Sequence, residues 1–297
     1  MIASTLIELF SALLTLSHMH CYKAFGQKIS SSLELPELPQ ADFDTPDIEI
    51  NPANIAKPIF NIPQVGSFAV PNHQTVLFDS LSSTPEDHIR LFLLGSCMGV
   101  ALQKKGYLLL HGNAIIKNNA CEIFLGYPGA GKSTLAGRYI QQGYQILSDD
   151  VCAIKFAPEP IVMPGYPYIK LWEDSAKMLG HDIRQLKPIA LREKKYHVPI
   201  HKSFCKEPMP LKKIHLLPKP SAVPSALNQA GNTYPRANAR GFIHASASRI
   251  QKLQILLENT YRLSLIETPQ ERVRHLKQCQ ILQSSVPINL QLGNFRQ

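Results

Sequence analysis

Apolar and polar positions alternate in short pieces over the first quarter of the chain. Between residues 22 and 80 the apolar side chains come in twos and threes, as at 48–50, 60–62 and 67–70, and Pro and Asn separate the pieces. Short alternating pieces bounded by such residues are typical of strands. We therefore predict a small, mostly β N-terminal region over residues 22–80, with nothing in it that looks catalytic.

A longer apolar stretch follows and has the pattern of a buried helix. The residues at 84–87, Thr-Pro-Glu-Asp, combine a capping hydroxyl, a first-turn proline and acids near the positive end of the helix. The stretch is apolar almost all round to about Gln103, which predicts a buried helix. Further runs at 107–110, 114–117 and 121–125 predict strands, the last two forming a hairpin.

Residues 126–133 fit the phosphate-binding (Walker A) pattern G-x-x-x-x-G-K-[ST]. An apolar strand candidate precedes them and a helix-compatible run follows, as the motif requires. Glycines let successive backbone N–H groups converge on phosphate oxygens, and the helix N-terminus adds partial positive charge. Lys132 would reach the outer phosphates, and the Ser133 hydroxyl would be a ligand of Mg²⁺. The predicted nucleotide-binding residues are Gly126, Gly129, Ala130, Gly131, Lys132, Ser133 and Thr134.

Two adjacent carboxylates follow the next strand candidate, 145–148. Asp149 and Asp150 would be costly at the end of a buried strand unless a cation or a proton-accepting role compensates. One of them would face Mg²⁺ and the other the incoming hydroxyl. His111 ends the strand that lies one hairpin before the phosphate loop, and the pattern leaves open whether it is structural or directed at the phosphates.

The remaining elements carry weaker signals. We predict a strand at 151–154, a rigid turn at 164–168 and a helix entered through 170–174, with Trp172, the single tryptophan, as a core anchor or a pocket wall. An amphipathic helix is expected at 251–263, a basic helix at 271–280 and a closing strand at 286–290. His197 and His201 have metal spacing, but the proline between them argues against a regular helix and a metal site.

Charge is unevenly distributed along the chain. The 297 residues carry a net charge of +9, but residues 1–185 hold 13 Lys and Arg against 17 Asp and Glu, and residues 186–297 hold 18 against 5. A basic C-terminal part suits an acidic partner or a polyphosphate, and no recognition motif supports nucleic-acid binding. Residues 218–241 read as a mobile loop in which Arg236 and Arg240 are solvated or, when the loop orders, clamp a phosphate or acidic substrate.

The cysteines and the first residues of the chain indicate the cellular compartment of the protein. Six cysteines are scattered without a C-x-x-C pair, which argues against zinc and a disulfide framework and predicts a cytoplasmic protein. Residues 1–21 form an apolar extension without the basic start of a secretory signal, and the run is short for a bilayer span, so no membrane is expected. Our hypothesis is that translation starts at Met19 or that residues 1–18 form a loose helix.

These motifs together resemble the HPr kinase/phosphorylase-related P-loop family. The matching segments are Leu110-His111-Gly112, 126–136 and 143–151. The segment from 164 to Trp172 is similar to a small subgroup found beside peptide-modifying enzymes, as are 22–26 and 286–287. The resemblance implies an α/β P-loop kinase core of the HPr kinase/phosphoenolpyruvate carboxykinase type over residues 81–297.

The resemblance also implies an activity and roles. The activity is Mg-ATP-dependent phosphorylation of a serine in a protein or precursor peptide, with Asp149 as general base, Asp150 as metal or positioning group, and His111 near the γ-phosphate. This chain has Thr134 where bifunctional relatives have an acidic residue, and lacks their Arg-Gly-Leu-Gly signature. Alternatives are a kinase for a small-molecule hydroxyl and a nucleotide-binding regulatory module, and the presence of a homo-oligomer stays open.

Overall fold

The computed structural model describes residues 19–191, 194–218 and 243–292. The apolar residues 1–18 and the loop with Arg236 and Arg240 lie outside these described residues. The chain divides into two compact units between Ala101 and Leu102, whereas the sequence placed the division at residue 80. Both units are mixed α and β, and the described strands form sheets of six, nine and three.

The first unit contains the six-stranded sheet, in the order β1-β2-β3-β6-β5-β4. Its strands are β1 (His20–Ala24), β2 (Gln27–Ser31), β3 (Ile48–Pro52), β4 (Phe60–Ile62), β5 (Gly66–Asn72) and β6 (Thr75–Ser80). Side chains of alternate positions, such as Ile48 and Ile50, are fully buried because successive residues of a strand face opposite sides. The mostly β region expected from the alternating pattern is confirmed.

The predicted buried helix is present and has a π-helical turn in its middle. It consists of α2 (Glu86–Phe92), the π-helical stretch Leu93–Cys97 and α3 (Met98–Lys104). Residues of the middle part, including Leu93, Cys97 and Ala101, are buried. The acidic Glu86 and Asp87 occupy the first turn, where the helix dipole favours negative charge.

The second unit is built on the nine-stranded sheet, with the path β10-β8-β9-β16-β12-β11-β7 and the pair β17 and β18 beside β16. Its strands are β7 (Leu108–Leu110), β8 (Gly112–Lys117), β9 (Ala120–Leu125), β10 (Gln145–Ser148), β11 (Cys152–Ala157), β12 (Glu159–Met163), β16 (Met209–Leu216), β17 (Ile243–Ser246) and β18 (Ile288–Leu292). A small separate sheet has the order β13-β15-β14, with β13 (Tyr168–Trp172), β14 (Lys187–Pro188) and β15 (Lys195–Pro199).

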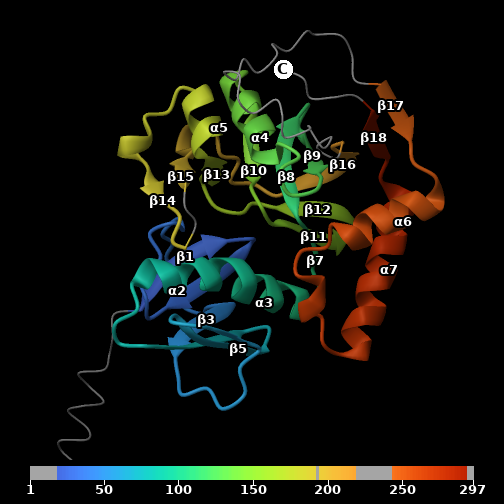
Figure 1. Ribbon diagram of the computed structural model, residues 1–297. Helices are drawn as coiled ribbons and strands as arrows, with labels where there is room; N and C mark the ends of the chain where they lie inside the picture. The colour runs from blue at the N-terminus through green and yellow to red at the C-terminus, as the bar shows by residue number, and fades with distance from the viewer. Residues whose placement is uncertain (1–18, 192–193, 219–242, 293–297) are drawn as a thin grey trace, which may run out of the picture. The chain divides into compact units, whose positions relative to one another are not determined.

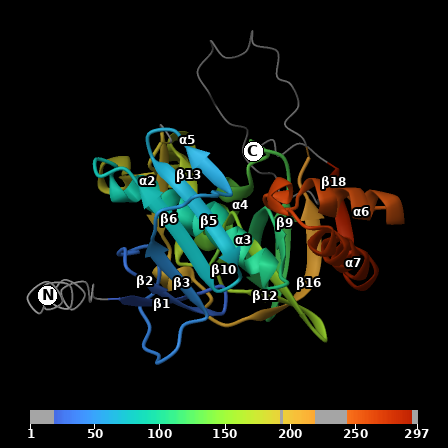
Figure 2. The ribbon, with the colours of Figure 1, turned by 90° about the horizontal axis from the view of Figure 1, so that it is seen from below.

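Helices cover both faces of the large sheet (Figure 1). These helices are α4 (Lys132–Gln141), α6 (Arg249–Glu258) and α7 (Pro269–Ser285). The short α5 (Glu173–Met178) packs against β13 and β15 of the small sheet, and 3₁₀ turns lie at Ile183–Gln185, His201–Ser203 and Leu263–Leu265. Strand β9 shows why two cores form: Ile123 and Leu125 pack in the cluster with α6 and α7, whereas Phe124 packs with α4. Figure 2 shows α6 and α7 side by side beyond β16.

The predicted hairpin that feeds the phosphate loop is confirmed. β8 and β9 pair antiparallel from Gly112↔Leu125 to Lys117↔Ala120. The turn residues Asn118 and Asn119 have φ of 50° and 57°, the left-handed conformation that two-residue hairpin turns require. Strand β16 pairs in parallel with the other edge of β9. The end of β9 therefore lies inside the sheet, and its last residue is buried.

The helix expected over 251–263 ends earlier than the apolar pattern indicated. α6 ends at Glu258 because the side chains of Asn259 and Thr260 turn back to the carbonyls of Ile255 and Leu256. The chain then pairs with β7: His111 N donates to the Asn259 carbonyl, and Tyr261 N donates to the Leu109 carbonyl. In the part of the chain that the structure describes, no helix is both long and apolar enough to cross a bilayer.

Candidate nucleotide and metal site

The phosphate loop connects the end of β9 to the first turn of α4. Gly129 and Gly131 have φ of 81° and 84°, values that favour glycine. A Cβ at Gly126 would approach the Cβ atoms of Ala130 and Leu217 to 3.1 Å, whereas a Cβ at Gly131 would meet nothing within 4 Å. Gly131 is the N-cap, and no described side chain caps the helix. The first N–H groups of α4 are therefore available to an anion.

Lys132 lies across its own loop. Its Nζ donates a 2.7 Å hydrogen bond to the Gly126 carbonyl and lies 3.5 Å from the Tyr127 carbonyl. Burial lowers the pKa of Lys132, and the carboxylates of Asp150 and Asp149 oppose that shift. The ammonium group is therefore held over the loop by the loop's own carbonyls.

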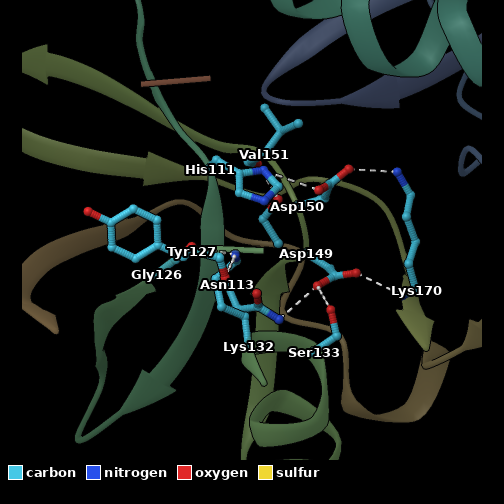
Figure 3. A network of polar contacts seen from close by, with 11 residues as sticks. His111, Asn113, Gly126, Tyr127, Lys132, Ser133, Asp149, Asp150, Val151 and Lys170 are labelled. Carbon is cyan, nitrogen blue, oxygen red and sulfur yellow. Dashed lines mark hydrogen bonds and ion pairs between the residues drawn. The ribbon is translucent and has the colours of Figure 1, made fainter. Parts of the chain in front are cut away.

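Asp149 is buried and accepts hydrogen bonds at both oxygens (Figure 3). Oδ1 accepts from Asn113 Nδ2 at 2.7 Å and from the Ser133 hydroxyl at 3.4 Å. Oδ2 accepts from the backbone N–H of Lys170 at 2.7 Å. Burial, helped by the neighbouring Asp150 carboxylate, raises the pKa of Asp149 to about 6. Three donors therefore fix this carboxylate beside the first turn of α4.

Asp150 contacts different residues from Asp149 because its backbone adopts an unusual conformation. Its φ of 72° lies in the left-handed region that non-glycine residues rarely adopt. Oδ2 accepts from Lys170 Nζ at 2.8 Å, and Oδ1 lies 3.3 Å from His111 Nδ1. Burial works to raise the pKa of Asp150, but Lys170 and His111 outweigh it and hold that pKa well below its ordinary value.

His111 and Lys170 flank Asp150 from two elements. Burial lowers the pKa of His111, although the Asp150 carboxylate opposes that shift, and a proton on Nδ1 suits the facing carboxylate. The ring stacks on Tyr261 at a centroid separation of 6.1 Å. For Lys170, burial works to lower the pKa, but Asp150 and Tyr166 outweigh it and raise the value well above the ordinary one.

The structure brings five of the predicted site residues together: His111, Lys132, Ser133, Asp149 and Asp150. Figure 3 shows all five in one close-up with Asn113 and Lys170. Two other predicted nucleotide-binding residues have side chains turned elsewhere. The Thr134 hydroxyl lies 2.8 Å from the Ser175 hydroxyl in α5, and the methyl group of Ala130 packs in the core with α4.

Sequence reasoning missed Asn113 and Lys170. Asn113 had a usable signal, because it lies two residues after His111 and alternate residues of an extended chain share a face. Lys170 had none, because its strand belongs to a different sheet and reaches Asp149 only through the tertiary fold.

The exposure of Trp172 overturns its expected role as a core anchor. Its side chain is 53% exposed, because it ends β13 and caps α5 at the surface, and Lys195 Nζ lies 5.4 Å from its ring. His197 and His201 both lie edge-on to Tyr168. Among the described residues, no group of three or more His, Cys, Asp or Glu side chains is arranged to hold a metal ion.

The donors around Asp149 nevertheless fit a hard cation that keeps phosphate or water ligands. Mg²⁺ is bound in proteins through one or two carboxylates together with substrate phosphates, and Asp149 and the Ser133 hydroxyl supply oxygens of that kind. Asn113 is 1% exposed, and its Oδ1 has no hydrogen-bond partner in the described part of the chain. A buried, unpaired acceptor is costly unless something binds it.

Comparison with known proteins adds little at the level of sequence. No family model matches the chain, and no curated protein matches it. Among the solved structures that match is the Hpr(Ser) kinase/phosphatase from Coxiella burnetii, with 16% identity and a TM-score of 0.28 over 47% of this chain and 76% of that chain. At this level of similarity, the function of the chain has to be inferred from its own residues.

Proposed function

We propose that the chain is an ATP- and Mg²⁺-dependent kinase that transfers a phosphoryl group to a serine hydroxyl of a protein or peptide. The observation that carries this is the meeting of a phosphate loop with an aspartate pair: the Ser133 hydroxyl of the loop lies 3.4 Å from Asp149. Phosphoryl transfer asks mainly for positioning and charge neutralisation, and these residues supply both. The choice of a peptide serine rests on the motif resemblance.

Of the two aspartates, Asp149 is the better candidate for binding Mg²⁺; we call its surroundings the metal side of the site. Its carboxylate, the Ser133 hydroxyl and Asn113 would hold Mg²⁺, which would neutralise charge on the phosphates when bound. This reverses the roles that the family resemblance implies, in which Asp149 acts on the acceptor and Asp150 assists with the metal or with positioning. The contact between Asp149 and Ser133 supports the reversal, since the loop serine is the expected metal-ligating hydroxyl.

Asp150, together with His111, is the better candidate for contacting the serine hydroxyl that accepts the phosphoryl group; we call this the acceptor side of the site. The serine Oγ would bond to the γ-phosphorus while the bond from that phosphorus to the bridging oxygen of ADP breaks, and the hydroxyl proton would pass to Asp150. A pKa of about 6 would by itself suit Asp149 as the base, but its Oδ1 lies 3.4 Å from the Ser133 hydroxyl, the expected ligand of Mg²⁺. In a loose transition state an ionised carboxylate that orients the hydroxyl is sufficient.

The test is intact-mass analysis of peptides incubated with Mg-ATP. The probe is a synthetic library with one fixed serine, beside a library with alanine in its place. We expect phosphate on the serine library alone, and its loss in Lys132→Ala and Asp150→Asn. ATP consumption without peptide phosphate would instead favour a small-molecule kinase, and ATP binding without consumption would favour a regulatory module.

Binding of a non-hydrolysable ATP analogue separates the two aspartates. We expect Asp149→Asn to weaken Mg²⁺-dependent binding about tenfold or more, as loss of a metal-site group does. Asp150→Asn should leave that affinity within about threefold while abolishing transfer, because an acceptor-orienting group acts on the chemical step. The opposite pattern would support the roles that the family resemblance implies.

A further inference from the structure

Lys170 contacts both aspartates through different atoms. Its backbone N–H donates to Asp149 Oδ2 at 2.7 Å, and its ammonium group donates to Asp150 Oδ2 at 2.8 Å. The residue lies in β13, where Ile169 and Leu171 on either side are buried in the core with α4. Alternation along the strand therefore directs the Lys170 side chain away from that core and toward the aspartates.

The ammonium group of Lys170 and the ring of His111 face the two oxygens of the Asp150 carboxylate. Lys170 Nζ lies at Oδ2, and His111 Nδ1 lies 3.3 Å from Oδ1. The Lys170 side chain is 14% exposed, so water screens this ion pair less than it screens a surface pair. The backbone at Asp150 is in a left-handed conformation, which surrounding contacts must maintain.

We propose that Lys170 is a positioning residue for the acceptor side of the site: its ammonium group fixes the orientation of the Asp150 carboxylate toward the incoming hydroxyl. This inference rests on the proposed function, because it gives Asp150 the acceptor and Asp149 the metal. Lys170 acts through Asp150, and its own backbone amide separately orients Asp149. Lys170 therefore links β13 of the small sheet to both aspartates.

This arrangement makes the two contacts separable by mutation. Lys170→Met keeps the backbone N–H that donates to Asp149 and removes only the ammonium group that donates to Asp150. In Lys170→Met we expect the rate of phosphoryl transfer to the serine library to fall about a hundredfold, the effect that a small misplacement of a reacting group produces. The affinity for the Mg²⁺-bound ATP analogue should stay within about threefold. Lys170→Arg, which keeps the charge, should lose less.

Two further variants control for folding. Lys170→Met leaves Asp150 without the ammonium group that donates to its Oδ2, so the melting temperature should fall, and the double variant Lys170→Met/Asp150→Asn should recover part of that loss while staying inactive. Lys177→Met is the matched surface control: Lys177 pairs with Glu173 on α5, and its side chain is 54% exposed. It should change neither transfer nor binding.

Three results would overturn the positioning role. One is transfer by Lys170→Met at the wild-type rate, and another is loss of Mg²⁺-dependent binding as large as that of Asp149→Asn. If the wild type transfers no phosphate to serine, the proposed function fails, and the melting temperatures of the single and double variants still decide whether Lys170 and Asp150 are coupled. Additive shifts in that cycle would be the third contradicting result.

Discussion

Asp149 and Asp150 show how one backbone angle separates two identical side chains. They are adjacent, but the left-handed φ at Asp150 turns its carboxylate toward His111 and Lys170. The Asp149 carboxylate instead accepts hydrogen bonds from Asn113 in β8 and Ser133 in α4. The opposite directions of their pKa shifts follow from these partners, because burial dominates at Asp149 and cationic neighbours dominate at Asp150. Identical residues thereby become suited to different roles.

Asn113→Ala tests the metal side at the level of a single residue. The variant removes the buried Oδ1 that has no partner in the described residues, and also the hydrogen bond to Asp149. We expect the affinity for the ATP analogue in the presence of Mg²⁺ to fall about tenfold, the low end for loss of a group that orients a metal ligand. The measurement is a binding titration with Mg²⁺ and again with a chelator.

The chelator titration is the internal control for Asn113→Ala. Without Mg²⁺ the variant and the wild type should bind the analogue equally, because the phosphate loop itself is unchanged. An equal loss of affinity in both titrations would mean that Asn113 supports the loop rather than the metal.

At the scale of elements, the pairing of β9 with β16 contains an ion pair that should make stability depend on pH. Glu122 Oε2 lies 3.0 Å from Nε2 of the buried His215 and 3.6 Å from Lys117 Nζ. The hydrogen bond from His215 and the charge of Lys117 outweigh burial and hold the pKa of Glu122 below its ordinary value of 4.5. The carboxylate therefore stabilises the fold above that value, and the contribution is lost as pH falls through the lower folded-state pKa.

Glu122→Gln should lower the free energy of unfolding by about 1.5–3 kcal/mol at pH 7, the range for a hydrogen bond to a charged group. The difference from wild type should shrink as pH falls below about 4.5, the ordinary carboxyl value. Urea unfolding at several pH values measures it, with Glu173→Gln as a control whose pair with Lys177 is at the surface of α5. A difference that stays constant with pH would show that packing, not charge, is responsible.

Elements whose signal is contiguous in the chain could be predicted, and those that depend on distant partners could not. The hairpin at 112–125 and the α4 start at Lys132 follow from turn and loop residues, and the structure contains both. The end of α6 does not follow from the apolar pattern, because Asn259 and Thr260 divert the chain to β7. Side-chain hydrogen bonds back to the helix overrode the periodicity there.

At the scale of the whole molecule, the candidate site belongs entirely to the second unit. His111, the phosphate loop, the aspartate pair and β13 all follow Leu102. Sequence motifs singled out the loop and the aspartates, but they left open which aspartate lies beside the loop serine, because the contact from α4 to Asp149 is tertiary. Lys170 could not be predicted for the same reason. It lies in a separate sheet, and no sequence pattern indicates that this sheet lies beside the aspartates.

Hydrogen exchange with and without the Mg²⁺-bound ATP analogue tests this placement across the molecule. A ligand that binds only the folded site stabilises it by about 2.7 kcal/mol at a concentration of a hundred times its Kd, and local opening of the elements around the ligand is suppressed most. We expect slower exchange at 126–135, 147–151 and 168–172, and little change in the six-stranded sheet. In Lys132→Ala, at the same analogue concentration, the slowing should largely disappear because the phosphates lose their cation. Equal slowing in the six-stranded sheet of the wild type would mean that the ligand acts on both units, and that a site confined to the second unit is wrong.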